Sequence, residues 1–174
     1  TSSPGMAFLL ATIAGTPNWE QFWAQLKAND VAVTNSWESA YYSEFIAGGG
    51  SRPMVVSYAS SPVAEVIYAD PPVDVSPTGV LLDSCFRQVE FAGILAGTRH
   101  PEEAQSLIDF LLSPTFQNEI PMSMFMYPVS QKAELPAEFI EHSQLTENPL
   151  SLEPAEIEAK RKEWTERWVE IVLD

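Results

Sequence analysis

The chain has 174 residues and a mass of 19.3 kDa, which is enough for one full hydrophobic core or two small ones. Hydrophobic residues make up 45% of it and charged residues 19%, a composition that folds rather than staying disordered. Its 24 Asp and Glu against 9 Lys and Arg give a net charge of −15, which disfavours binding to nucleic acid or anionic lipid and favours a cationic ligand.

Two further features of the composition limit the possible classes of protein. Cys85 is the only cysteine, so neither a disulfide within the chain nor a multi-cysteine zinc site can form; its role and the redox compartment stay open. No run approaches the roughly 18 apolar residues that cross a bilayer. The chain starts directly on a helix signal without a basic leader, so we expect an N-terminal part and any signal peptide to lie outside this sequence.

The first half of the chain predicts helices alternating with short strands. Ser3 and Pro4 are typical of a helix start, and the apolar spacing of Trp19, Phe22, Trp23 and Leu26 is typical of a helix with one buried face. The expected elements are a buried helix over 6–14, a helix from residue 19, a strand at 31–33, a helix after Ser36 ending at Gly48, a strand at 54–58 and a loop over 70–79.

The second half predicts two long helices, a short helix that restarts at Ser113-Pro114, and two extended stretches. A helix should begin at Pro101 after His100, and a final helix should begin near Pro154, with one apolar stripe and acid–base pairs four residues apart on its outer face. Residues 85–95 and 121–129 are expected to be extended.

Motifs of known catalytic sites are absent from the sequence. His100 and His142 have no nucleophile nearby in sequence, so neither is expected to be catalytic. The adjacent Tyr41 and Tyr42 are similar to phenolate pairs that bind ferric iron in some periplasmic proteins, but no His or carboxylate partner is assured for them. No metal site is therefore predicted.

Two groups of residues indicate a binding function. The segment 1–5, Thr-Ser-Ser-Pro-Gly, places hydroxyls and free backbone N–H groups at a helix N-terminus, where they either hold an anion such as phosphate or only cap the helix. Aromatic residues gather at the ends of predicted elements, where they either clamp a flat cationic ring or fill the core. They are Trp37, Tyr41, Tyr42, Tyr58, Phe125 and Tyr127.

Several ordered motifs together resemble the second half of thiamine-binding periplasmic proteins. They are TSSPG, SWESAYYSEF, VVSYASSPVAEV, FRQVEFAGIL, AQSLIDFLLSPTFQNEIP and FMYPV, and the resemblance extends from Thr1 to Asp174. It implies an α/β, type II periplasmic-binding-protein fold, of which this chain is a C-terminal fragment with a mixed sheet and flanking helices. Residues 1–88 would form part of the second lobe, 89–130 would return to the first lobe, and 131–174 would pack back on the lobes.

The resemblance also implies the ligand and the residues that bind it. Ser2 and Ser3 correspond to the loop at the phosphate end of thiamine phosphates. Trp37 corresponds to the tryptophan of a Gly-Trp pair, although Ser36 replaces the glycine here. Tyr41, four residues after Trp37, is also expected to bind the ligand. Tyr58 corresponds to the tyrosine of Ser-Tyr-x-x-Ser-Pro, and Phe125 stands where a relative has a stacking tryptophan.

The function implied is that of a periplasmic receptor, not an enzyme, which delivers thiamine, thiamine monophosphate or thiamine diphosphate to the permease of an ABC importer. It would use no cofactor and bind no nucleic acid. A receptor for ferric iron or another small solute is the alternative within the same class. A phosphoryl-handling enzyme of thiamine metabolism is a further alternative, but it needs a catalytic base that this sequence does not offer.

Overall fold

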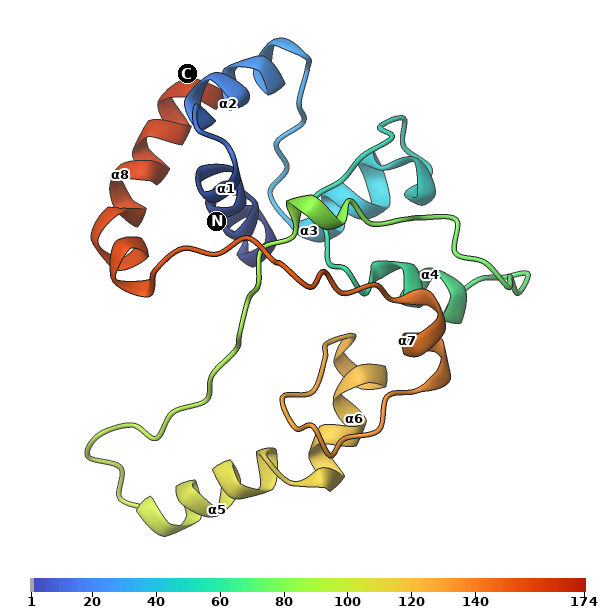
Figure 1. Ribbon diagram of the computed structural model, residues 1–174, viewed down its shortest axis with the longest axis vertical. Helices are drawn as coiled ribbons and strands as arrows, with labels where there is room; N and C mark the ends of the chain where they lie inside the picture. The colour runs from blue at the N-terminus through green and yellow to red at the C-terminus, as the bar shows by residue number, and fades with distance from the viewer. Residues whose placement is uncertain (1) are drawn as a thin grey trace. The chain divides into compact units, whose positions relative to one another are not determined.

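The computed structural model describes residues 2–174 and shows helices joined by long irregular segments (Figure 1). Thr1, the first residue of the predicted anion-binding loop, lies outside the described residues. The elements are α1 (Ser3–Gly15), α2 (Trp19–Ala28), α3 (Trp37–Ser39), the π-helix η1 (Ala40–Glu44), the 3₁₀-helix η2 (Ile46–Gly48), α4 (Ser61–Ile67), the 3₁₀-helix η3 (Leu82–Ser84), α5 (Pro101–Leu111), α6 (Pro114–Met124), α7 (Ala137–His142) and α8 (Pro154–Val172).

The chain divides into two compact units. The first holds the chain up to Tyr58, together with Leu81–Gln88 and Leu145–Asp174. The second holds Ala59–Val80 and Val89–Gln144. The assignment of residues 1–88, 89–130 and 131–174 to the lobes of a receptor stays a prediction.

The expectation of an α/β fold with a mixed sheet was wrong. Among the described residues there is no sheet, only two isolated parallel bridges, which join Phe45 to Arg52 and Phe86 to Leu150. The expected strands at 31–33 and 54–58 do not pair into a ladder. Their apolar, β-branched composition indicates an extended backbone, but a sheet also needs neighbouring strands to satisfy its N–H and C=O groups, and local sequence does not supply these.

The core of the first unit lies among α1, α2 and α8. Leu9, Trp23 and Val172 are buried together there, one from each helix. Trp23 lies edge-on to Trp168, with ring centroids 5.5 Å apart, and its indole N–H donates to the hydroxyl of Thr12 at 2.9 Å. The apolar face predicted for the helix from residue 19 and the apolar stripe of the final helix are therefore the two surfaces that meet in this core.

Spacing four residues apart predicts three ion pairs on the outer face of α8, Glu156 with Lys160, Glu158 with Lys162 and Glu163 with Arg167, and the structure differs in part. Lys160 does pair with Glu156 at 2.9 Å. Arg167, however, pairs with Glu170 on the same helix and with Glu20 on α2, both at 2.9 Å. Spacing within one helix could not reveal the pair with Glu20, because it depends on how α2 and α8 pack.

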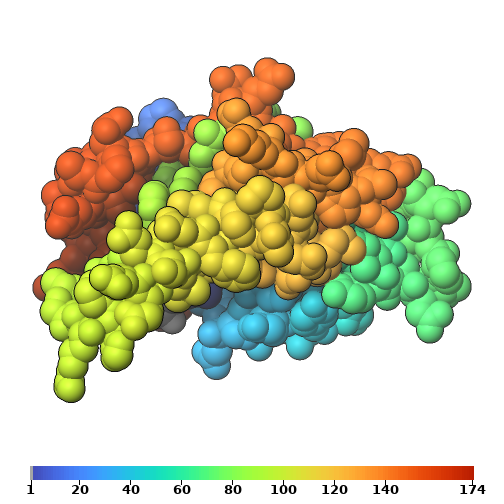
Figure 2. Space-filling model, turned by 90° about the horizontal axis from the view of Figure 1, so that it is seen from below, coloured from blue at the N-terminus to red at the C-terminus, as the bar shows by residue number. Residues whose placement is uncertain are grey.

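In the second unit, α5 and α6 pack together and lie side by side in yellow and orange-yellow at the surface shown in Figure 2. The extended stretch expected over 121–129 was partly wrong, because α6 continues through Pro121 to Met124 and ends at Phe125 in the left-handed conformation, with a φ of 52°. The side chain of Gln117 holds this end: its amide donates to Leu111 O at 2.7 Å and accepts from the N–H groups of Val129 and Ser130.

Large apolar side chains of the second unit are exposed along α5 and the segment before it. Phe91 is 90% exposed and Leu95 is 82% exposed, and Leu107 and Phe110 of α5 are about half exposed. A hollow of about 470 Å³ lies between residues 92–98 and α5, and none of the predicted ligand residues lines it. Within residues 2–174, no helix combines the length and the apolar character that crossing a membrane requires.

Candidate functional site

The structure gathers aromatic side chains in the first unit around Trp37. The ring of Trp37 lies 5.1 Å from that of Tyr41, 5.6 Å from that of Tyr42 and 6.0 Å from that of Tyr58, measured between centroids. We call Trp37, Tyr41, Tyr42 and Tyr58 the aromatic cluster. Three of its members were predicted ligand residues, and the structure brings these three together.

The local backbone explains how the cluster forms. Ser36 caps α3 with its hydroxyl, which accepts a hydrogen bond from the N–H of Ser39 at 3.1 Å. The helix expected after Ser36 is confirmed only in part, because after one turn it widens into η1 and then breaks at Phe45. Trp37, Tyr41 and Tyr42 therefore lie within two successive turns, close enough for their rings to touch.

The members of the cluster differ in exposure, which separates two kinds of role. Tyr41 is 4% exposed and also contacts Phe45, so its ring supports the cluster from the interior. Tyr42 is 60% exposed and Tyr58 is 47% exposed, while Trp37 is half-buried. Rings of Trp and Tyr that reach the surface offer a π-face to a flat cation, and the buried ring fixes their orientation.

Hydrogen bonds orient the tryptophan and a neighbouring acid. The indole N–H of Trp37 donates to the hydroxyl of Ser57 at 2.9 Å, and Ser57 directly precedes Tyr58. Hydrogen bonds from its own backbone N–H and from the Ser36 hydroxyl lower the pKa of Glu38, so this exposed carboxylate is ionised at neutral pH. Glu38 follows Trp37 in sequence, and its exposed negative charge favours a cationic ligand over an anionic one in this part of the unit.

The predicted anion site lies at the N-terminus of α1. Ser2, rather than Ser3, is the N-cap: its hydroxyl accepts from the N–H of Gly5 at 3.3 Å. Ser3 is the first residue of α1 and is exposed. The helix start thus already uses one of the two predicted serines as a cap, which leaves the hydroxyl of Ser3 as the better candidate for an anion.

Phe125 belongs to a second group of aromatic side chains, in the second unit. Its ring stacks on that of the buried Phe139, with centroids 6.2 Å apart and an interplanar angle of 27°, and it lies 5.8 Å from the ring of Tyr68. The hydroxyl of Ser60 donates to the carbonyl oxygen of Phe125 at 2.5 Å. Burial raises the pKa of the nearby Tyr127 phenol, which therefore stays protonated at neutral pH.

Several residues around these rings were not among the predicted ligand residues. Tyr42 forms a pair with Tyr41 in the sequence, but nothing in the sequence distinguishes its exposed ring from the buried ring of Tyr41. Ser57 and Ser60 flank the predicted Tyr58, and only the structure shows what their hydroxyls contact. Within residues 2–174, no group of three His, Cys, Asp or Glu side chains is placed to hold a metal ion.

Comparison with known proteins gives one consistent result. The family of bacterial extracellular solute-binding proteins matches residues 7–147. A protein of Escherichia coli K12 named thiamine-binding periplasmic protein is 35% identical over 172 residues, which are 97% of this chain and 50% of that protein. Proteins of the same name from Salmonella typhimurium LT2 and Brucella suis are 34% and 27% identical. The chain spans about half the length of these relatives. No solved structure matches it significantly.

Proposed function

The chain belongs to the family of bacterial extracellular solute-binding proteins, and from that premise we propose that it acts in a receptor for thiamine or thiamine phosphates. The relatives reported above are named as binding proteins, not as enzymes. The observation that supports the proposal most directly is the aromatic cluster.

The chemistry of thiamine fits this arrangement. Thiamine joins two flat rings, one of them a cationic thiazolium, and the exposed rings of Tyr42 and Tyr58 around Trp37 can attract it by stacking and by cation–π interaction. Ser3, and Ser2 where its capping bond allows, would interact with the phosphate of a phosphorylated vitamer. The buried Tyr41 would act by supporting Trp37. The role of Phe125, which lies in the second unit, stays a prediction from the resemblance.

Location and partners follow from the same premise. The relatives are named periplasmic, and we place this chain in the periplasm too. There it would bind its ligand without a covalent step and deliver it to the permease of an ABC importer, with no cofactor and no nucleic acid involved.

A thermal-shift panel separates this function from its alternatives. Thiamine, its monophosphate and its diphosphate should each raise the melting temperature, since a ligand that binds only the folded state stabilises it. Ferric iron should leave the melting temperature unchanged. A shift with ferric iron and none with any vitamer would instead support the iron receptor, and release of inorganic phosphate from thiamine diphosphate would support the enzyme.

A further inference from the structure

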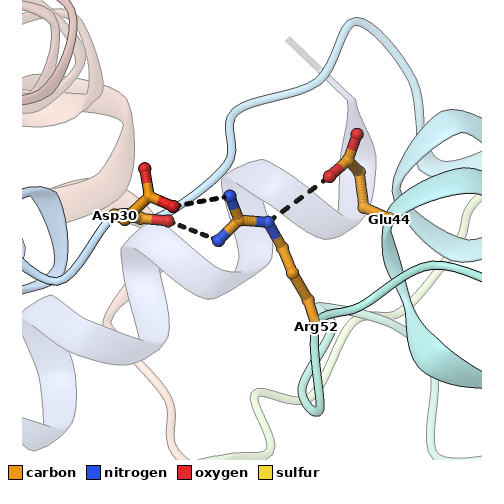
Figure 3. Close-up of polar contacts among 3 residues, drawn as sticks. All are labelled: Asp30, Glu44 and Arg52. Atoms are coloured by element: carbon orange, nitrogen blue, oxygen red, sulfur yellow. Dashed lines mark hydrogen bonds and ion pairs between the residues drawn. The ribbon is translucent and has the colours of Figure 1, made fainter.

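The side chain of Arg52 connects two segments of the first unit that are far apart in sequence (Figure 3). Its Nε donates to Oε2 of Glu44 at 3.3 Å, and its Nη2 donates to Oδ2 of Asp30 at 3.1 Å. Nη1 donates to the backbone carbonyl of Asp30. One planar guanidinium thus contacts both segments at once, which a single ammonium cannot do with the same geometry.

The backbone of Arg52, like its side chain, contacts the end of η1. Its N–H donates to the carbonyl oxygen of Glu44 at 2.9 Å, and its carbonyl accepts from the N–H of Ile46 at 2.9 Å. The turn that joins Ile46 to Arg52 passes very close to η1. A Cβ on Gly48 or Gly50 in this turn would collide with backbone atoms of residues 41–44. Arg52 therefore closes this turn directly against the end of η1.

The two segments that Arg52 joins have different roles. Glu44 is the last residue of η1, which carries Tyr41 and Tyr42 of the aromatic cluster. Asp30 follows α2, whose Trp23 is part of the core of the first unit, and it adopts a left-handed backbone conformation with a φ of 60°. A change at Arg52 should therefore move η1 relative to α2 and with it the rings of the cluster.

We propose that Arg52 is a positioning residue of the aromatic cluster, which sets the orientation of its rings through Glu44 and Asp30. The effect on ligand affinity rests on the function proposed above. The contacts of Arg52 are partly exposed, with 32% of its own side chain and 94% of that of Asp30 accessible, so they contribute little to global stability. Their effect is instead local, on the end of η1.

The test uses a matched control within the same unit. Arg167 also binds two carboxylates, those of Glu20 and Glu170, and is similarly exposed, but its partners lie on α2 and α8. Arg52→Gln should lower the affinity for thiamine about fivefold. This is the change in affinity that the free energy of one well-formed exposed ion pair would produce. Arg167→Gln should leave that affinity unchanged, and Arg52→Lys should restore part of it. Titration calorimetry gives all three affinities.

A measurement without ligand separates this proposal from the function. The protein is labelled with 5-fluorotryptophan, and the ¹⁹F resonance of Trp37 is assigned with Trp37→Phe. Arg52→Gln should shift or broaden the Trp37 resonance, while Arg167→Gln should affect only the tryptophans near α8, such as Trp168. Arg52→Lys should give an intermediate spectrum.

Each outcome decides the proposal. An unchanged Trp37 resonance in Arg52→Gln would overturn it, as would an equal loss of thiamine affinity in Arg167→Gln. A protein that does not bind thiamine at all would contradict the proposed function, and the Trp37 resonance would then decide the role of Arg52 by itself.

Discussion

Ser2 and Ser3 stand next to each other, but their hydroxyls have different surroundings. That of Ser2 caps α1, whereas Ser3 is exposed at the start of the same helix. Ser3→Ala should weaken binding of thiamine mono- and diphosphate by about 1.5–3 kcal/mol, the contribution of a hydrogen bond to a charged group, and leave free thiamine unchanged. Titration calorimetry with the three vitamers measures this.

The matched control is Ser2→Ala, which should lower the free energy of unfolding by about 0.5–2 kcal/mol because it removes the N-cap. Chemical denaturation measures that change. Equal losses of affinity for thiamine and its phosphates in Ser3→Ala would show that Ser3 does not contact phosphate.

Trp37 contributes its ring to the aromatic cluster and also donates a hydrogen bond to Ser57. Two substitutions separate the effect of the ring from that of the hydrogen bond. Trp37→Phe keeps an aromatic ring but loses the bond to Ser57, so the free energy of unfolding should fall by about 1 kcal/mol. Trp37→Ala also loses the ring, and thiamine should then bind about 1–3 kcal/mol more weakly. If Trp37→Ala lost several degrees of melting temperature but bound thiamine as the unchanged protein does, Trp37 would be a core residue only.

At the scale of elements, the contact between α2 and α8 should depend on pH. The hydrogen bond from Arg167 lowers the pKa of Glu20, so the folded state binds a proton at this carboxyl less readily than the unfolded state. The stability from this pair is therefore present at neutral pH and is lost as the pH falls through the lowered pKa.

The difference in melting temperature between the unchanged protein and Glu20→Gln should thus be positive at neutral pH and vanish in acid. The difference should be small, because the Glu20 side chain is 43% exposed and water screens the pair. High salt should reduce it further. A difference that grew in acid would contradict this account of the contact.

The end of α6 depends on one buried polar side chain. Gln117 is 3% exposed and bonds Leu111, Val129 and Ser130, which places the segment that follows Phe125. Gln117→Leu should lower the free energy of unfolding by about 1–3 kcal/mol, because the partly buried C=O of Leu111 and N–H groups of Val129 and Ser130 lose their partner. Asn118→Ala, which removes an exposed bond to the N–H of Glu134, should cost less than Gln117→Leu. Denaturant titration of both variants tests the difference.

At the scale of the whole molecule, local patterns predicted the longer helices, but they predicted neither the short helices α4 and α7 nor the absence of a sheet. Capping residues and apolar spacing were enough for α1, α2, α5 and α8, because those signals lie within one helix. The strands at 31–33 and 54–58 failed because pairing depends on residues distant in sequence. An extended stretch was expected from Pro121 onward, but α6 continues through Pro121 to Met124.

The candidate site was predictable to a similar extent. Motifs singled out Trp37, Tyr41 and Tyr58, which the structure brings together. Only packing produces the difference in exposure between Tyr41 and Tyr42. Packing also brings Arg52 to Glu44 and Asp30, which are distant from it in sequence.

The central claim is that the aromatic cluster binds the rings of thiamine, and calorimetric titration of thiamine into the unchanged protein and Trp37→Ala tests it most directly. Our account predicts saturable one-site binding to the unchanged protein, and an affinity about tenfold lower or more in Trp37→Ala, as expected for the loss of one stacked ring. Saturable binding of equal affinity to both proteins, or no binding to the unchanged protein, would contradict it.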